Sequence, residues 1–224
     1  MKKIAYILAG GMGSRFECNV PRQFVKIDQK MLLEYTLDVF QQHELIDEIV
    51  LVANVFENDI TLEMMQTKYP KLKEIVPGGE TRGFSIINAA TSVSEHEEAY
   101  IVIHDACRPF VDTEIITRGI QSLDKRELAK TVFKPQDDIL LEDKKVAARS
   151  EYMILSSPDF IRLSLLKKLV AHDLFGLSCV FTAALQYNPD PDFEYIFSNR
   201  RNIKITFPED LAVATLYLKE DTAD

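Results

Sequence analysis

The sequence predicts an α/β protein with a doubly wound, mostly parallel sheet, formed as one domain over residues 1–224. Short β-branched runs alternate with amphipathic segments along most of the chain, and this alternation is typical of parallel sheets covered by helices on both faces. The residues are 46% hydrophobic and 27% charged, which is ordinary for a globular chain of this length. Glycine-rich segments directly after strands place candidate ligand loops at one edge of that sheet.

Strands are expected where short apolar runs are rich in β-branched residues. These runs lie at 4–9, 48–53, 73–76, 100–104 and 130–133. Helices are expected between them, because apolar residues recur at helical spacing over 32–40, 86–93 and 115–123. The run at 100–104 is almost continuously apolar, so we expect this strand to be buried on both faces.

The alternation ends near Lys134. The polar stretch at 135–155 carries a short apolar run between charged residues, which predicts a protruding β-hairpin arm that could serve dimerisation. A helix is expected over 158–170 and a late strand over 202–206. The last helix is expected to begin with Pro208 at its first position and acidic residues in its first turn.

The net charge limits the classes of partner that the protein is expected to bind. With 26 Lys+Arg against 35 Asp+Glu the net charge is −9, which argues against general binding to nucleic acids or anionic membranes. No apolar run is long enough to span a bilayer, so we expect a cytoplasmic protein. The three cysteines have no metal-ligand spacing, and each is interpreted as a small buried residue.

The loop after the first strand is a candidate phosphate loop. It carries Gly10, Gly11 and Gly13, whose backbone N–H groups can approach an anion closely, and two arginines, Arg15 and Arg22, follow. The alternative is a glycine turn with surface arginines. A dinucleotide fingerprint fails because Phe16 stands where glycine is required, and a Walker loop fails because no Gly-Lys-Ser/Thr tripeptide occurs.

Asp105 closes the buried strand at 100–104 and is a candidate Mg²⁺ ligand. One carboxylate at the carboxyl edge of the sheet can hold Mg²⁺ that takes its remaining ligands from water and substrate phosphates. The alternative is a carboxylate that caps a helix or pairs with arginine. His104 is interpreted as a structural hydrogen-bonding residue, and Cys107 lacks the third group that would orient a Cys-His pair.

Two further segments bear on a ligand site. Gly78 and Gly79 follow the third strand and allow close backbone approach to a ligand, with Ser85 near a helix start. An ordinary β-to-α loop is the alternative. Lys204 stands between two isoleucines in the late strand, where a lysine that points inward must have a reason, but on this segment alone a solvated edge-strand lysine is the favoured interpretation.

Taken together and in this order, the segments resemble the family of cytidylyltransferases that make CDP-activated polyols, the 2-C-methyl-D-erythritol 4-phosphate and ribitol-5-phosphate cytidylyltransferases. The resemblance covers nearly the whole chain. It rests on LAGGMGSR with PRQF, GGETRGFS, HDACRPF, Arg149 with Ser157-Pro158, and NIKITFPEDL. It implies a Rossmann-like nucleotidyltransferase core with a protruding arm, a homodimer, and transfer of CMP from CTP to a polyol phosphate with Mg²⁺.

The resemblance also implies residue roles. Arg15, Arg22 and Lys204 are expected to surround the triphosphate as catalytic residues, and Asp105 to bind both Mg²⁺ and nucleotide. The expected acceptor ligands are Arg149, Ser157 and Thr182, partly across the dimer. The other expected nucleotide-binding residues are Ala9, Gly10, Gly11, Gly13, Ser14, Gly78, Gly79, Arg82 and Ser85.

Several positions depart from the family pattern. Arg22 replaces the lysine of the usual Pro-Lys-Gln, and an arginine presents a planar fork instead of a compact ammonium. The usual Gln-Thr-Pro-Gln is Ser156-Ser157-Pro158-Asp159, the usual Thr-Asp is Thr182-Ala183, and the usual Asp-Thr is Asp137-Asp138. The acceptor pocket therefore differs more than the CTP pocket. A catalytically impaired nucleotide-binding homologue, or an enzyme using another NTP with a sugar phosphate, stays open as an alternative.

Overall fold

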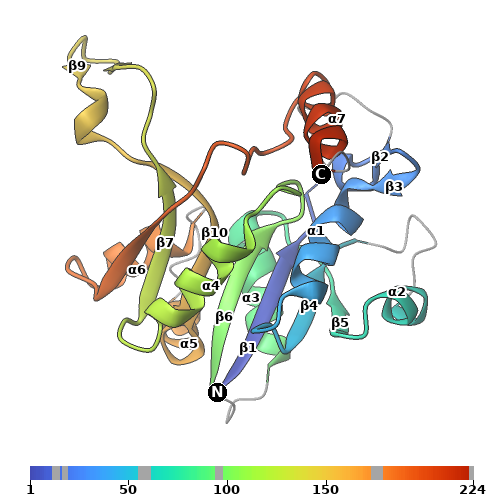
Figure 1. The fold of residues 1–224 in the computed structure, drawn as a ribbon. Coiled ribbons are helices and arrows are strands. Elements are labelled where there is room, and N and C mark those ends of the chain that lie inside the picture. The colour runs from blue at the N-terminus through green and yellow to red at the C-terminus, as the bar shows by residue number, and fades with distance from the viewer. Residues whose placement is uncertain (12–15, 17–19, 55–61, 94–97, 173–178, 222–224) are drawn as a thin grey trace.

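The computed structural model describes residues 1–11, 16, 20–54, 62–93, 98–172 and 179–221 (Figure 1). Its main sheet has seven strands in the order β11-β7-β10-β6-β1-β4-β5. These strands are β1 (Lys2–Leu8), β4 (Glu48–Val52), β5 (Leu72–Val76), β6 (Ala99–Asp105), β7 (Leu128–Phe133), β10 (Ile154–Arg162) and β11 (Phe193–Phe197). Two short ladders join β2 (Lys26–Ile27) to β3 (Lys30–Met31) and β8 (Ile139–Leu140) to β9 (Val146–Ala147).

Helices connect and cover these strands. The α-helices are α1 (Leu32–Gln42), α2 (Leu62–Lys68), α3 (Arg82–Ser92), α4 (Thr113–Ser122), α5 (Leu163–Ala171), α6 (Val180–Tyr187) and α7 (Asp210–Asp221), and the 3-10 helices are η1 (Arg22–Phe24) and η3 (Arg149–Glu151). The five predicted strands and the three helices predicted between them are all present, within one or two residues of their expected bounds except for α3, which begins four residues before the expected start at residue 86.

The sheet is mostly parallel, as predicted. Strand β1 pairs in parallel with β4 and β6, β4 pairs in parallel with β5, and β11 pairs in parallel with β7. Strand β10 runs antiparallel between β6 and β7. All seven residues of β6 are buried, which confirms the expectation drawn from its apolar run.

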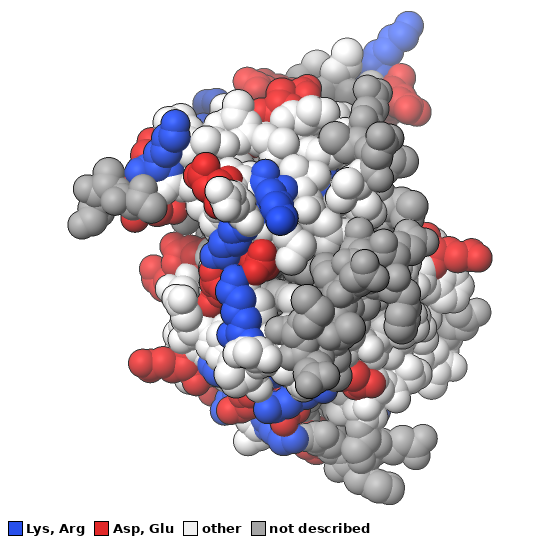
Figure 2. All heavy atoms as spheres, turned by 90° about the vertical axis from the view of Figure 1, so that its right-hand side faces the viewer, with Lys and Arg blue, Asp and Glu red and all other residues white. Residues whose placement is uncertain are grey.

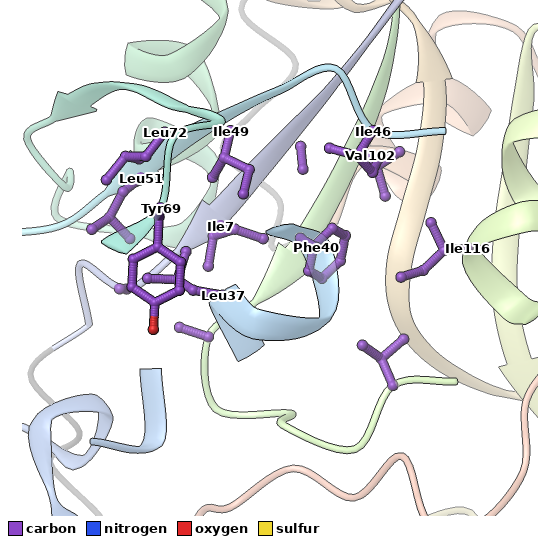
Figure 3. Packing of buried hydrophobic residues seen from close by; sticks show 14 of the residues in the cluster. Ile7, Leu37, Phe40, Ile46, Ile49, Leu51, Tyr69, Leu72, Val102 and Ile116 are labelled. Atoms are coloured by element: carbon purple, nitrogen blue, oxygen red, sulfur yellow. The ribbon is translucent and has the colours of Figure 1, made fainter. Parts of the chain in front are cut away.

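Helices lie on both faces of the sheet, so the fold is doubly wound. Alternate residues of β1 enter two different cores, with Ile7 in one and Tyr6 in the other. The first core takes apolar residues from α1, α2 and α4, and the second from α3, α5 and α6. In the first core Phe40 of α1 lies between Ile7 and Ile116 of α4 (Figure 3).

Two predictions near the C-terminal half are wrong. Residues 158–162 belong to β10, and the helix expected over 158–170 begins only at Leu163 as α5. A short buried apolar run has no period that separates strand from helix, and Pro158 resembled a helix start. Residues 202–206 form no strand, because this segment pairs with no neighbouring strand among the described residues. Its Ile205 N–H donates to the Cys107 carbonyl, just beyond the end of β6, at 2.9 Å.

Helix α7 begins at Asp210, two residues after the expected start, and Pro208 lies in the preceding turn. The sequence patterns also missed α2, α6, β11 and the small β2-β3 ladder. Two of these elements complete the sheet or its cover: β11 forms the edge beside β7, and α6 packs apolar residues into the second core.

The predicted arm is a hairpin. Strands β8 and β9 pair antiparallel and are followed by η3, and in Figure 1 this hairpin projects beyond the upper end of β7. Leu140 and Val146 point out from it with 70% and 68% of their surfaces exposed. On the face shown in Figure 2, basic and acidic side chains are interspersed over the described residues. Among the helices of the described part of the chain, none is long and apolar enough to cross a membrane.

Candidate active site

A cavity of about 620 Å³ opens at the carboxyl ends of β1 and β6, where open α/β sheets bind ligands. It is lined by Leu8, Gly10, Gly11, Arg22, Asn54, Gly78, Gly79, Glu80, Thr81, Arg82, Ser85, Asp105, Cys107 and Lys204. Most of the predicted nucleotide-binding residues therefore meet at one place. Gly13, Ser14 and Arg15 lie outside the described residues.

Two glycine loops form one side of the cavity because their backbones touch. A Cβ on Gly10 would lie 2.7 Å from the Cα of Gly78, a distance that no real side chain tolerates. Asn54 Oδ1 accepts from the Gly78 N–H at 3.0 Å, and Ser85 Oγ accepts from the Gly79 N–H at 3.0 Å. This close approach of the two backbones therefore requires glycine at both positions. Ser85 is a predicted ligand residue, and its hydrogen bond also holds the second glycine loop in place.

Gln23 holds the first loop from behind. Its side-chain Nε2 donates to the carbonyl of Ala9 at 2.6 Å and to that of Gly11 at 3.0 Å. Gln23 is 5% exposed and Ala9 is 3% exposed. Ala9 therefore contributes its backbone to the loop, and its side chain offers no surface to a ligand. Its neighbour Arg22 lines the cavity from η1. In the Pro-Arg-Gln motif, Arg22 therefore presents a cation to the cavity, and the next residue, Gln23, anchors the loop.

Asp105 is the electrostatic centre of the cavity. Its Oδ1 accepts from Arg82 Nε at 3.0 Å, its Oδ2 accepts from Lys204 Nζ at 2.9 Å, and Arg108 Nε lies 3.7 Å from Oδ2. Burial would raise the pKa of Asp105, but these three cations hold it well below its ordinary value. Lys204 points into the cavity and is not the solvated edge-strand lysine that its segment alone favoured.

The ion pairs continue from Asp105 into the sheet. Arg82 Nη2 donates to Asp159 Oδ2 at 3.0 Å, and the other oxygen of Asp159 accepts from Lys130 Nζ. Burial would lower the pKa of Arg82, but the two carboxylates raise it. Sequence reasoning missed Lys130 and Asp159 as contributors to the site. The available signal was a lysine inside the apolar run 128–133, the same kind of signal that identified Lys204.

His104 and Cys107 are structural here, as predicted. Burial lowers the pKa of His104 to about 4, so the ring is neutral at pH 7. The Arg108 carbonyl, which can only accept, lies 3.0 Å from Nε2, so Nε2 carries the proton and Nδ1 accepts from the Ser157 hydroxyl at 3.2 Å. Burial raises the pKa of the Cys107 thiol, which keeps it protonated.

The three predicted acceptor ligands do not line this cavity. Ser157 is 2% exposed, and its hydroxyl also accepts from the Asp105 N–H at 3.4 Å. Thr182 lies half-buried in α6. Arg149 is exposed in η3 at the base of the arm, where its Nη1 donates to the Gln136 carbonyl at 2.9 Å.

Arg200 joins Arg149 at the base of the arm, a contact that sequence reasoning missed. With its amide oxygen turned toward Arg200, Gln136 accepts from the Nε and Nη2 of that guanidinium at 3.0 and 2.9 Å. Gln136 thereby binds both arginines, Arg149 through its backbone carbonyl and Arg200 through its side-chain amide oxygen. Such a pair of planar cations suits a phosphate group.

The donor set around Asp105 fits a magnesium ion that is shared with substrate phosphates. The described residues hold no group of three or more His, Cys, Asp or Glu side chains able to enclose a metal. Mg²⁺ does not need one, because it is commonly bound by one or two carboxylates together with water and phosphate oxygens. Asp105 lines the cavity and supplies one such carboxylate.

Comparison with known proteins places the chain among nucleotidyltransferases. A family model described as IspD, 2-C-methyl-D-erythritol 4-phosphate cytidylyltransferase, matches residues 4–220. The enzyme of that name from Clostridium acetobutylicum is 33% identical over 97% of this chain and 98% of its own. The 4-diphosphocytidyl-2C-methyl-D-erythritol synthase of Anaerococcus prevotii superposes with a TM-score of 0.83 and 26% identity, over 97% of this chain and 96% of the other.

A second kind of relative is a two-function protein. The bifunctional ribulose 5-phosphate reductase/CDP-ribitol pyrophosphorylase Bcs1 of Haemophilus influenzae is 35% identical over 95% of this chain. The chain spans 47% of the length of that protein. The relatives therefore carry two different polyol names on one fold.

Proposed function

The chain belongs to the 2-C-methyl-D-erythritol 4-phosphate cytidylyltransferase (IspD) family, and from that premise we propose that it transfers CMP from CTP to a polyol phosphate and releases pyrophosphate. The observation that carries the proposal is the Lys204-Asp105 pair, with 2.9 Å between Nζ and Oδ2, in a cavity bounded by two touching glycine loops. The loops offer backbone groups for a nucleotide, and the pair offers a cation and a carboxylate for its phosphates and metal.

The proposed reaction depends more on neutralising the negative charge of the reactants than on general acid-base catalysis. An oxygen of the acceptor phosphate attacks the α-phosphorus of CTP, the bond from that phosphorus to the bridging oxygen breaks, and pyrophosphate leaves with the electron pair. Both reactants are anions. Arg22 and Lys204, which line the cavity, would hold the triphosphate and offset the charge on the pentavalent phosphorus. Arg15 would add a third cation.

Asp105 would hold Mg²⁺, which supplies further positive charge to the triphosphate oxygens when it is bound. The backbone of Gly10, Gly11, Gly78 and Gly79 would hold the cytosine and ribose. The reaction needs no nucleophilic side chain, which agrees with a Cys107 thiol kept protonated and a His104 ring enclosed by hydrogen bonds.

We infer ribitol 5-phosphate as the acceptor ahead of 2-C-methyl-D-erythritol 4-phosphate. The acceptor positions depart most from the family pattern, and Asp138 offers carboxylate oxygens to hydroxyl groups where threonine is usual. The relative that is named a CDP-ribitol pyrophosphorylase is 35% identical to this chain. A more hydroxylated acceptor requires more polar partners, and a site built for them rejects an analogue that leaves them unpaired.

We also propose a homodimer in which the arm completes the site of the partner. Arg149 and Arg200 meet at Gln136 and lie outside the lining of the cavity in their own protomer. Leu140 and Val146 expose large apolar surfaces on the same hairpin, and such surfaces are normally covered in an assembly. An arm docked on a second copy would bury them and carry the arginine pair to the partner's acceptor phosphate.

Pyrophosphate release tests the proposal. Purified protein with CTP and Mg²⁺ is given ribitol 5-phosphate or 2-C-methyl-D-erythritol 4-phosphate, and the CDP product is identified by mass. Release with the first acceptor and little with the second supports the proposal, and the reverse preference overturns the acceptor assignment. Replacing CTP with ATP, GTP or UTP tests the open alternative of another nucleotide.

A protein that releases no pyrophosphate with either acceptor has a different interpretation. If CTP with Mg²⁺ still raises the unfolding temperature, the protein is the impaired nucleotide-binding homologue. Arg22→Lys, which restores the usual family residue, tests impairment directly: an inactive protein that gains turnover in this variant is an impaired enzyme, whereas a protein that is already active and tuned to Arg22 keeps or loses activity.

A further inference from the structure

Lys130 and Asp159 form a buried ion pair across two neighbouring strands. They stand directly opposite in the β7-β10 ladder, with side chains 3% and 0% exposed. Lys130 Nζ also donates to the Ser156 carbonyl at 2.6 Å. Two charges enclosed this completely are costly unless each is paired, so neither residue tolerates loss of its partner without consequence.

This pair is the inner end of a charge chain that reaches the cavity. Asp159 pairs with Ile103 of β6, two residues before Asp105, so both carboxylates lie on the same face of the sheet. Arg82, at the start of α3, spans the gap, with Nε on Asp105 and Nη2 on Asp159, both at 3.0 Å. Signs alternate along the chain from Lys130 to Lys204.

Asp105 has both oxygens engaged by cations, Arg82 on Oδ1 and Lys204 on Oδ2. A divalent cation that binds Asp105 must compete with one of them. Lys204, whose side chain is 32% exposed, can turn to the triphosphate that arrives with the metal. The Arg82 side chain is 22% exposed and requires an anionic partner in its present position. Asp159 is that partner, because its Oδ2 keeps one end of the guanidinium paired after Asp105 is released.

We propose that Asp159, balanced by Lys130, is a positioning residue that holds Arg82 and so frees Asp105 to bind the divalent cation of the nucleotide. The inference rests on the proposed function, because it assumes that CTP enters this cavity with a metal. A neutral amide in place of the Asp159 carboxylate could accept a hydrogen bond from Arg82 but would offer it no countercharge.

The test measures how much Mg²⁺ strengthens CTP binding, without acceptor and therefore without turnover. Calorimetric titration of the full-length protein with CTP is run once in Mg²⁺ and once in EDTA, and the ratio of the two dissociation constants is compared among variants. For Asp159→Asn we expect this ratio to fall at least about fivefold, because Arg82 then competes with the metal for Asp105. Affinity in EDTA should change much less.

Lys130→Met is the matched control. It breaks the same buried pair and so lowers stability comparably, but it leaves Asp159 on Arg82 and should keep the wild-type ratio. If Asp159→Asn alone fails to fold, the double variant Lys130→Met/Asp159→Asn removes both charges together and should show the reduced ratio.

An unchanged ratio in Asp159→Asn or in the double variant would overturn the inference, as would an equal fall in Lys130→Met, which would indicate a merely structural role. Wild-type protein that binds CTP with no gain from Mg²⁺ overturns the metal part of the proposed function and this inference together. Wild-type protein that binds no CTP overturns the proposed function itself.

Discussion

Asp105 depends for its charge on two residues far from it in the sequence, Arg82 and Lys204, and on the nearby Arg108. Arg82, Arg108 and Lys204 surround the carboxylate and hold its pKa low although it is buried. The sequence interpretation offered two readings of Asp105, a metal ligand or an arginine-paired carboxylate. The structure has the arginine pairing. Under the proposed function, binding of Mg²⁺ would be a second state of the same residue, because Mg²⁺ can be held by a single carboxylate.

Asp105→Asn is expected to lower turnover by about 10²- to 10³-fold, because the amide cannot replace a charged ligand of the metal. Circular dichroism should show the fold retained. Asp192→Asn is the matched control, since Asp192 pairs with Arg126 at 2.6 Å at the surface, with its side chain 46% exposed. Near-normal turnover in Asp105→Asn would refute the metal role.

His43 should make the stability of the protein depend on pH. It is 6% exposed, Nδ1 accepts from the Leu45 N–H at 3.2 Å, and burial lowers its pKa below the ordinary value of 6.5. Below pH 6.5 the unfolded chain therefore binds more protons than the folded one, so the free energy of unfolding falls with falling pH. Urea unfolding at pH 8 and pH 5.5 should show a smaller fall for His43→Gln, and equal falls would contradict the assignment.

At the scale of elements, the site depends on where segments end and cross. Strand β6 brings Asp105 to the carboxyl edge, α3 starts there with Arg82, and the extended segment before α7 crosses above to deliver Lys204 (Figure 1). The sequence predicted this last segment as a strand because Ile203 and Ile205 alternate with Lys204. Alternation indicates extended backbone, but only the neighbouring chain decides whether a ladder forms.

Gly10→Ala is expected to destabilise the protein by about 1–3 kcal/mol, because its Cβ would lie 2.7 Å from Gly78 Cα and the two loops would have to separate. Gly11→Ala is the control for stability, since a Cβ there meets nothing within 4 Å, and its effect should stay within about 0.5 kcal/mol. Urea unfolding without ligand measures both. Equal stabilities for the two variants would show that the loops separate freely.

At the scale of the whole molecule, the arm is the feature that bears on assembly. It extends beyond β7 and carries apolar residues outward, with Leu140 70% exposed (Figure 1). The arginine pair at its base lies outside its own cavity. The proposed dimer would account for both features, because one contact would bury the apolar surface and bring the cations to a partner's substrate.

Leu140→Glu is therefore expected to shift the protein from dimer toward monomer and to lower turnover with it, because a buried carboxylate opposes docking of the hairpin. Light scattering coupled to size-exclusion chromatography gives the mass in solution. The control is Leu216→Glu on α7, which is 55% exposed and away from the arm, and should leave the mass unchanged. A wild-type protein that is monomeric at all concentrations would refute the proposed dimer.

The sequence by itself determined the doubly wound sheet, the glycine loops, Asp105, Lys204 and the arm. Each of them has a local signal in the sequence: the period of the apolar residues, the residue types of a turn, or a charged residue beside or inside an apolar run. It did not determine that residues 158–162 form a strand, that Gln23 fastens the first loop, or that Lys130 and Asp159 join the charges of the site. Those outcomes depend on which segments become neighbours. Only the tertiary structure decides which buried charge meets which, since pairing across strands depends on register and not on distance along the chain.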